Sequence, residues 1–209
     1  MVPELRLILV FHDPGLSEGL KLVEDLVLKL SQHVRFKIIA YPISDIERGV
    51  AGIEEGDVVF ALLPFRGGHL VQVTDYALGR GALAVYKIPL DLIARRIVER
   101  LEGCRSATLL YWRAKRFIEE QEEDLKFIAS TIKRSLGIEV RLASSCEDPV
   151  CDGCLVVTSL LPGRLTLEAL RSGGEVRIPY LLEILGDDVV AWIKGYAERL
   201  YNLQASQVG

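Results

Sequence analysis

The chain contains an internal repeat with a period near half its length. The segment 58–64 (VVFALLP) reappears at 156–162 (VVTSLLP), and an Ile-Pro pair and a helix-like segment follow each copy. Solenoid repeats have periods of roughly 20–50 residues, so this longer period indicates two similar lobes instead. Because 209 residues suffice for two small domains, we predict one lobe at 1–104 and a degenerate repeat of it at 105–209.

Strands and helices alternate along both halves. Short apolar runs bounded by turn residues predict strands at 5–11, 35–41, 57–63 and 82–87, and then at 107–112, 138–143, 154–160 and 175–178. Apolar residues at helical spacing predict helices at 17–32, 45–53, 70–78, 90–101, 117–136, 165–170 and 187–203. This alternation predicts an α/β fold in which each lobe is a parallel sheet flanked by helices.

Composition limits the classes of partner. The net charge is −4, whereas nucleic-acid-binding proteins usually present a basic face. No apolar run of about 20 residues is present, so we expect no membrane span. The sequence enters its first strand without a charged-then-apolar leader, which favours a cytoplasmic protein. One Met and a single Asn (Asn202) are typical of thermophile proteins, which avoid thermolabile residues.

Only the first copy carries histidines at the ends of its strands. His12 follows the first predicted strand, and His69 follows the third, directly after Gly67 and Gly68. Carboxyl ends of parallel strands meet at one edge of the sheet, where ligands bind. Two neutral imidazoles there can hold cobalt, nickel or zinc and can accept protons. The alternative to a functional site is that His12 is only a turn residue and that His69 caps a helix.

The loop around the second histidine resembles that of a known family. Residues 62–70 (LLPFRGGHL) are similar to the signature loop of the CbiX-type sirohydrochlorin cobaltochelatases, which are class II chelatases. That family has another histidine after its first strand, which His12 matches. The resemblance implies insertion of a divalent metal into sirohydrochlorin or a related tetrapyrrole held between two chelatase-like lobes. Cobalt is the metal substrate it favours, with nickel or ferrous iron as alternatives, and His12 and His69 would be the catalytic residues that hold the metal and accept pyrrole protons.

Some positions depart from the family pattern. His12 lies between Phe11 and Asp13, where family members usually have Gly before and Gly-Ser after. The family often has an acidic residue at the end of its second strand, and here only Tyr41 or Asp45 could replace it. We expect Phe11 and Tyr41 to shape the substrate pocket. No phosphate-binding glycine motif is present, which suits ATP-independent chemistry.

Basic residues are expected to recognise the substrate. The resemblance implies a tetrapyrrole with many carboxylates, and arginine forks suit carboxylates. Arg66, Gly67 and Gly68 lie in the signature loop, and Arg113 is near the place that His12 occupies in the first copy. Further candidates lie on loops of the second lobe: Lys115, Arg116 and Arg164.

Four cysteines lie in or beside the second copy. Cys146, Cys151 and Cys154 form a cluster, and Cys104 lies at the junction of the lobes. The spacing permits disulfides, core packing, a zinc site or an iron–sulfur cluster, of which disulfide or core packing ranks first.

Two alternatives to the chelatase remain. One is a non-catalytic protein that binds a tetrapyrrole or a metal, and the other is a cysteine-based metal or redox role in the second lobe. A chain with two lobes also suggests either a monomer with pseudo-twofold lobes or a dimer.

Overall fold

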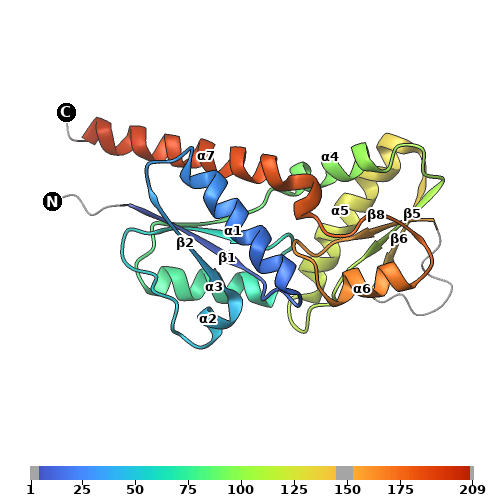
Figure 1. The fold of residues 1–209 in the computed structure, drawn as a ribbon, viewed down its shortest axis with the longest axis horizontal. Helices are drawn as coiled ribbons and strands as arrows, with labels where there is room; N and C mark the ends of the chain where they lie inside the picture. The colour runs from blue at the N-terminus through green and yellow to red at the C-terminus, as the bar shows by residue number, and fades with distance from the viewer. Residues whose placement is uncertain (1–4, 145–152, 208–209) are drawn as a thin grey trace.

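Each half of the chain folds around a parallel sheet (Figure 1). The structure is a computed structural model, and it describes residues 5–144 and 153–207. The first half contains β1 (Arg6–Phe11), α1 (Ser17–Ser31), β2 (Lys37–Pro42), α2 (Ile43–Glu47), β3 (Val58–Leu62), α3 (Gly68–Gly79), β4 (Ala84–Lys87) and α4 (Leu90–Arg100). The second contains β5 (Ser106–Leu110), α5 (Ile118–Leu136), β6 (Glu139–Ala143), β7 (Cys154–Val157), α6 (Arg164–Arg171), β8 (Glu175–Ile178) and α7 (Leu182–Gln207).

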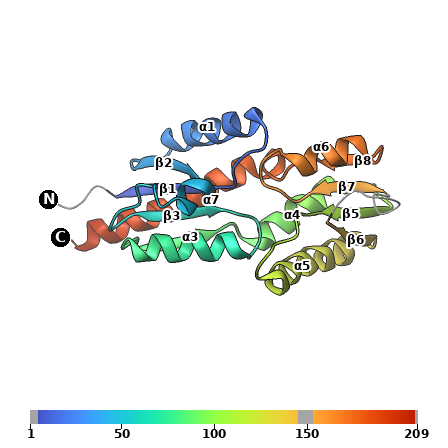
Figure 2. The same ribbon diagram turned by 90° about the horizontal axis from the view of Figure 1, so that it is seen from below.

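The two sheets have the same topology. Their strand orders are β2-β1-β3-β4 and β6-β5-β7-β8, and all the pairs are parallel. The predicted α/β fold with two repeated parallel sheets is therefore confirmed. In Figure 2, α1 and α5, which follow the first strand of each lobe, lie on opposite sides of the molecule, as a pseudo-twofold relation requires.

Both faces of the first sheet are buried, which explains the near-continuous apolar runs in its strands. Alternate residues of β1 belong to different cores because successive side chains of a strand point to opposite faces. Leu7 and Leu9 belong to the core that includes residues of α1 and α7, whereas Ile8 and Val10 belong to the core that includes residues of α2 and α3. The first of these cores continues into the second lobe, so one apolar core joins the two sheets.

The lobes exchange their last helices. Helix α4 follows the first sheet but packs against α5 and β8 of the second lobe, while α7 follows the second sheet and packs against α1. Figure 1 shows α7 running from the junction of the lobes along the top of the first lobe, while α4 lies at the top of the second. Its Trp192 ring lies 5.2 Å from that of Phe60 in β3, and its Tyr196 ring lies 4.2 Å from that of Tyr86 in β4.

An ion pair joins the two exchanged helices. Arg96 of α4 donates from Nε and Nη2 to the carboxylate of Asp188 in α7, at 2.5 and 2.9 Å. Such two-point geometry suits an arginine fork. The predicted boundary at 104/105 stays a prediction, but a division there separates α4 from the lobe against which it packs.

Two helices differ from their predicted extents by more than two residues at one end or both. The helix expected at 45–53 ends at Glu47, because Gly49 has φ of 70° and the backbone N–H groups of Val50 and Ala51 both bond to the carbonyl of Asp45. The last helix begins at Leu182 instead of residue 187. Among the described residues, no helix is long and apolar enough to cross a membrane.

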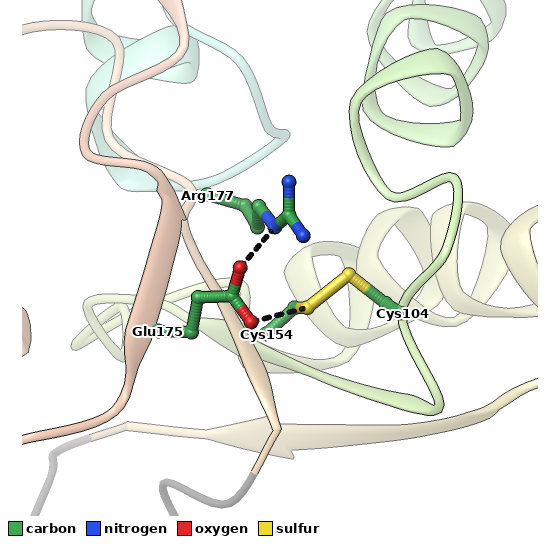
Figure 3. Close-up of a disulfide and its surroundings, with 4 residues drawn as sticks. All are labelled: Cys104, Cys154, Glu175 and Arg177. Atoms are coloured by element: carbon green, nitrogen blue, oxygen red, sulfur yellow. Dashed lines mark hydrogen bonds and ion pairs between the residues drawn. A yellow bond between two sulfur atoms is a disulfide. The ribbon is translucent and has the colours of Figure 1, made fainter.

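A disulfide joins Cys104, in the connection between α4 and β5, to Cys154 at the start of β7 (Figure 3). Beside it, Glu175 forms an ion pair with Arg177, at 2.7 Å, and its other carboxylate oxygen lies 3.8 Å from the Cys154 sulfur. The bond fixes the chain where it leaves the exchanged helix α4. Cys146 and Cys151 lie outside the described residues.

Replacing Cys154 with Ala should lower the free energy of unfolding by about 2–4 kcal/mol, because the bond closes a loop of about 50 residues in the unfolded chain. Denaturant unfolding under oxidising conditions measures this loss. Cys104→Ala and the double variant should show the same loss, since either change removes the one bond. A double variant with twice the loss would contradict this account.

Candidate functional site

The carboxyl edges of the two sheets face one another across a cleft of about 1200 Å³. The first lobe contributes loops that follow β1 and β3, and the second contributes loops that follow β5 and β7. The lobes approach closely at the rim, where a Cβ added to Gly15 would lie 3.5 Å from the Cα of Gly163. The cleft therefore lies where open parallel sheets bind their ligands.

The two predicted histidines meet in this cleft. His12 directly follows β1 and His69 is the second residue of α3. Nδ1 of His69 lies 3.2 Å from Nε2 of His12, and the rings meet edge to face. The prediction that they converge is confirmed, because β1 and β3 are neighbouring strands.

The separation of the two nitrogens suits a shared metal ion. With metal–nitrogen bonds of about 2.0–2.1 Å, a nitrogen separation of 3.2 Å corresponds to an angle of about 100° at the metal. This angle lies between those of octahedral and tetrahedral coordination. No group of three or more His, Cys, Asp or Glu side chains that could hold a metal is found in the described parts of the chain. The pair thus offers two ligands and leaves the other positions of an ion open.

An acidic residue that the sequence interpretation missed lies beside the pair. Glu47, the last residue of α2, has its carboxylate 3.7 Å from Nε2 of His69 and lines the same cleft. Histidines that bind a metal through one ring nitrogen usually donate the N–H of the other to a carboxylate. Glu47 is placed to do this for His69. The sequence signal for Glu47 was its position after the second strand, where the family often has an acidic residue. Only Tyr41 and Asp45 were considered at that place.

Asp13 ties the His12 loop to the helix that carries Glu47. Its carboxylate accepts hydrogen bonds from the backbone N–H of Ser44, at 3.0 Å, and from the Ser44 hydroxyl, at 2.5 Å. Ser44 lies in the first turn of α2, where a carboxylate satisfies an otherwise unpaired N–H group. Asp13 therefore orders the loop next to His12.

His12 is held neutral. Its ring reaches the cleft, but the surrounding protein atoms disfavour the charged form and lower its pKa from 6.5 to about 4. Repulsion from His69 lowers this pKa further, and Asp13 acts weakly in the opposite direction. A neutral imidazole can bind a metal without first losing a proton.

The second lobe lines the cleft with aromatic rings and cations. Loop 112–117, which follows β5, presents exposed side chains of Trp112, Arg113, Lys115, Arg116 and Phe117. None of its three cations forms an ion pair within the described part of the chain. This wall therefore suits a flat, negatively charged ligand.

A buried glutamine shapes loop 112–117. Gln121 accepts a hydrogen bond from the backbone N–H of Ala114, at 2.8 Å, and donates one to the carbonyl of Trp112, at 2.9 Å. Phe117 has φ of 58°, an unfavourable value for an aromatic residue that is often found at functional sites. The loop is thus held in a defined shape.

Trp112 and Arg113 both lie shortly after β5, as His12 lies directly after β1. The Arg164 guanidinium lies 5.5 Å from the centre of the Trp112 ring, within reach of a cation–π contact.

Of the remaining residues predicted to line the substrate pocket, some line the cleft and others pack in the cores. Gly67 and Gly68 line the cleft, as does Arg66, but the Arg66 side chain is ion-paired to Glu123 and Asp124 of α5. Phe11 is 3% exposed and packs in the core. Tyr41 packs with α2 and α3. Phe11 and Tyr41 are not among the cleft residues, which differs from our expectation, because their strand positions direct them into the cores.

The two disulfide-bonded cysteines lie far from this chemistry in the fold. Cys104 and Cys154 are bonded to each other, and Cys154 begins β7, at the sheet edge opposite the cleft. The disulfide interpretation holds for this pair. An iron–sulfur or zinc site that uses these two sulfurs is therefore not supported.

Comparison with known proteins identifies the fold. No protein-family model matches the sequence, and no match among curated proteins is found. Among solved structures, the chain is similar to the sirohydrochlorin chelatase SirB from Bacillus subtilis subspecies spizizenii, crystallised in complex with cobalt. The TM-score is 0.65 at 13% sequence identity, over 93% of this chain and 96% of that one. The chain has the two-lobed class II chelatase fold, while the CbiX type stays a prediction.

The lowered pKa of His12 gives a pH prediction. Its imidazole should titrate at about pH 4 in the folded chain, compared with 6.5 in the unfolded chain. Between these values only the unfolded state binds the proton, so this group makes the fold more stable as pH rises through the window. Proton NMR of the His12 ring measures the midpoint. His69→Ala should raise it while burial keeps it below 6.5, and a midpoint near 6.5 in the native chain would contradict this assignment.

Proposed function

We propose that this protein inserts a divalent metal, with cobalt the leading candidate, into a carboxylated tetrapyrrole such as sirohydrochlorin without using ATP. The observation that carries the proposal is the His12–His69 pair, with nitrogens 3.2 Å apart in a cleft between two chelatase-like lobes. The similarity to a sirohydrochlorin chelatase crystallised with cobalt supports it. Because the pair supplies only two ligands, a bound metal keeps open coordination positions, which suits an ion that must be transferred to the tetrapyrrole.

The proposed reaction needs a metal site and proton acceptors. As the ring nitrogens bind the metal, two pyrrole N–H protons must leave. His12 is a weak base because its pKa is about 4, so we assign it to the metal. We assign proton acceptance to Glu47 and to Nδ1 of His69, which is free to accept a proton once the metal has passed to the ring. The Glu47 carboxylate lies 3.7 Å from Nε2 of His69, and both side chains are about half exposed. This division refines the expectation that both histidines do both tasks.

Loop 112–117 and the side chain of Arg164 supply the proposed substrate contacts. Trp112 offers a flat apolar surface for a macrocycle, and Arg113, Lys115 and Arg116 offer exposed donors for its carboxylates. The side chain of Arg164 stacks near Trp112 while it pairs with Glu168. In this proposal the first lobe handles the metal and the second orients the ring.

Histidine variants test the reaction. Under anaerobic conditions, the native chain should speed cobalt insertion into sirohydrochlorin above the protein-free rate, as followed by absorbance. His12→Ala and His69→Ala should each lower the rate by about 100-fold or more, since each removes one of two ligands and misplaces the metal. His33→Ala is a matched control, because His33 lies beyond the end of α1, outside the cleft, and should leave the rate unchanged. Binding with a spectral shift but no acceleration would instead establish a non-catalytic tetrapyrrole-binding protein.

Cation variants test the substrate wall. Arg113→Gln and Arg116→Gln should each raise the KM for a carboxylated tetrapyrrole about tenfold with little change in kcat, because each loses a charged hydrogen bond to a peripheral group. Lys126→Gln on the exposed face of α5 is the control, and it should leave KM unchanged. An equal KM in the native chain and both loop variants would exclude this wall from substrate binding.

A further inference from the structure

A buried carboxylate of the second lobe holds the loop that leads to His69. Asp124 in α5 accepts a hydrogen bond from the backbone N–H of Arg66, at 2.7 Å, and another from its Nε, at 2.8 Å. The ammonium group of Lys87, at the end of β4, lies 3.5 Å away. The Asp124 side chain is only 2% exposed, and these three donors all belong to the first lobe.

A buried carboxylate is stable only when charges and hydrogen bonds compensate it. The pKa of Arg66 is raised chiefly by its hydrogen bond to Asp124, as expected for a tight ion pair. Glu123 also bonds to Arg66, at 2.9 Å, but its side chain is 66% exposed and it contacts only the guanidinium. Of these two neighbouring carboxylates, Asp124 alone bonds to the loop backbone.

The loop passes close to the second lobe at two further points. A Cβ on Gly67 would lie 3.9 Å from that of Ala114, and one on Gly68 would lie 3.6 Å from that of Arg116. His69 comes next in the chain. By contrast, the loop of His12 is held within the first lobe, through the bonds between Asp13 and Ser44. The loop of His12 is therefore held by the first lobe, and the loop that leads to His69 is held by the second.

We propose that Asp124 is a positioning residue that fixes His69 Nδ1 relative to His12 Nε2, and through this separation sets the affinity of the pair for a metal ion. It acts across the lobe interface and does not contact the metal. This inference rests on the proposed function only in that the pair binds a metal.

Cobalt(II) chloride alone, without tetrapyrrole, is the probe. Calorimetric titration and the visible absorption bands of bound cobalt should show binding to the native chain that is weakened at least about tenfold in Asp124→Asn, as for residues that orient metal ligands. Glu123→Gln removes a neighbouring charge that contacts the same Arg66 and should change the affinity little. Asp188→Asn breaks the ion pair between α4 and α7, so it should lower the melting temperature without changing cobalt affinity.

The outcomes separate the two proposals. Absence of cobalt binding by the native chain would defeat the proposed function, whereas native affinity in a folded Asp124→Asn variant would overturn the positioning role alone. Equal weakening by Glu123→Gln or Asp188→Asn would also overturn it, because a general loss of charge or stability would then explain the effect. If Asp124→Asn does not fold, Asp124→Glu, which keeps the charge but displaces it, should bind cobalt more weakly than the native chain, and unchanged affinity would count against the role.

Discussion

The exchange of α4 and α7 between the lobes is the constraint on which the rest of the structure depends. Each sheet buries apolar residues under a helix that belongs to the other half of the sequence, so one core runs through both lobes. Apolar burial drives this arrangement, and the ion pair of Arg96 with Asp188 joins the exchanged helices. The carboxyl edges of the two sheets are consequently held face to face, and the cleft exists because they are.

Within that cleft, the two lobes have divided their chemistry. Directly after its first strand the first lobe has His12, while the second has Trp112 and Arg113 shortly after its own first strand. The first wall can bind a borderline metal through neutral imidazole, and the second offers an aromatic face and exposed cations. A repeated fold thus gives two unlike walls because a few loop residues differ, while the sheets that carry them have the same topology.

Much of this was predictable from local sequence patterns. The buried strands are continuous apolar runs, and the placement of His12 and His69 follows from the rule that parallel strand ends share an edge. Glu47 was missed because only Tyr41 and Asp45 were considered in place of the acidic residue after the second strand, whereas the short helix α2 carries Glu47 to the cleft. Phe11 and Tyr41 were misplaced because a position at the end of a strand does not say which face the side chain occupies. The helix exchange and the contact of Asp124 with the His69 loop join residues that are far apart in the sequence (58 positions for Asp124 and Arg66), for which sequence periodicity gives no signal.

The most direct test of the account is X-ray absorption spectroscopy of the cobalt-loaded protein. The account predicts two imidazole nitrogens at about 2.0–2.1 Å from the metal, of which one is lost in His12→Ala and one in His69→Ala. A first shell of oxygen atoms alone, or a spectrum that neither substitution alters, would contradict the central claim that these two histidines form the metal site.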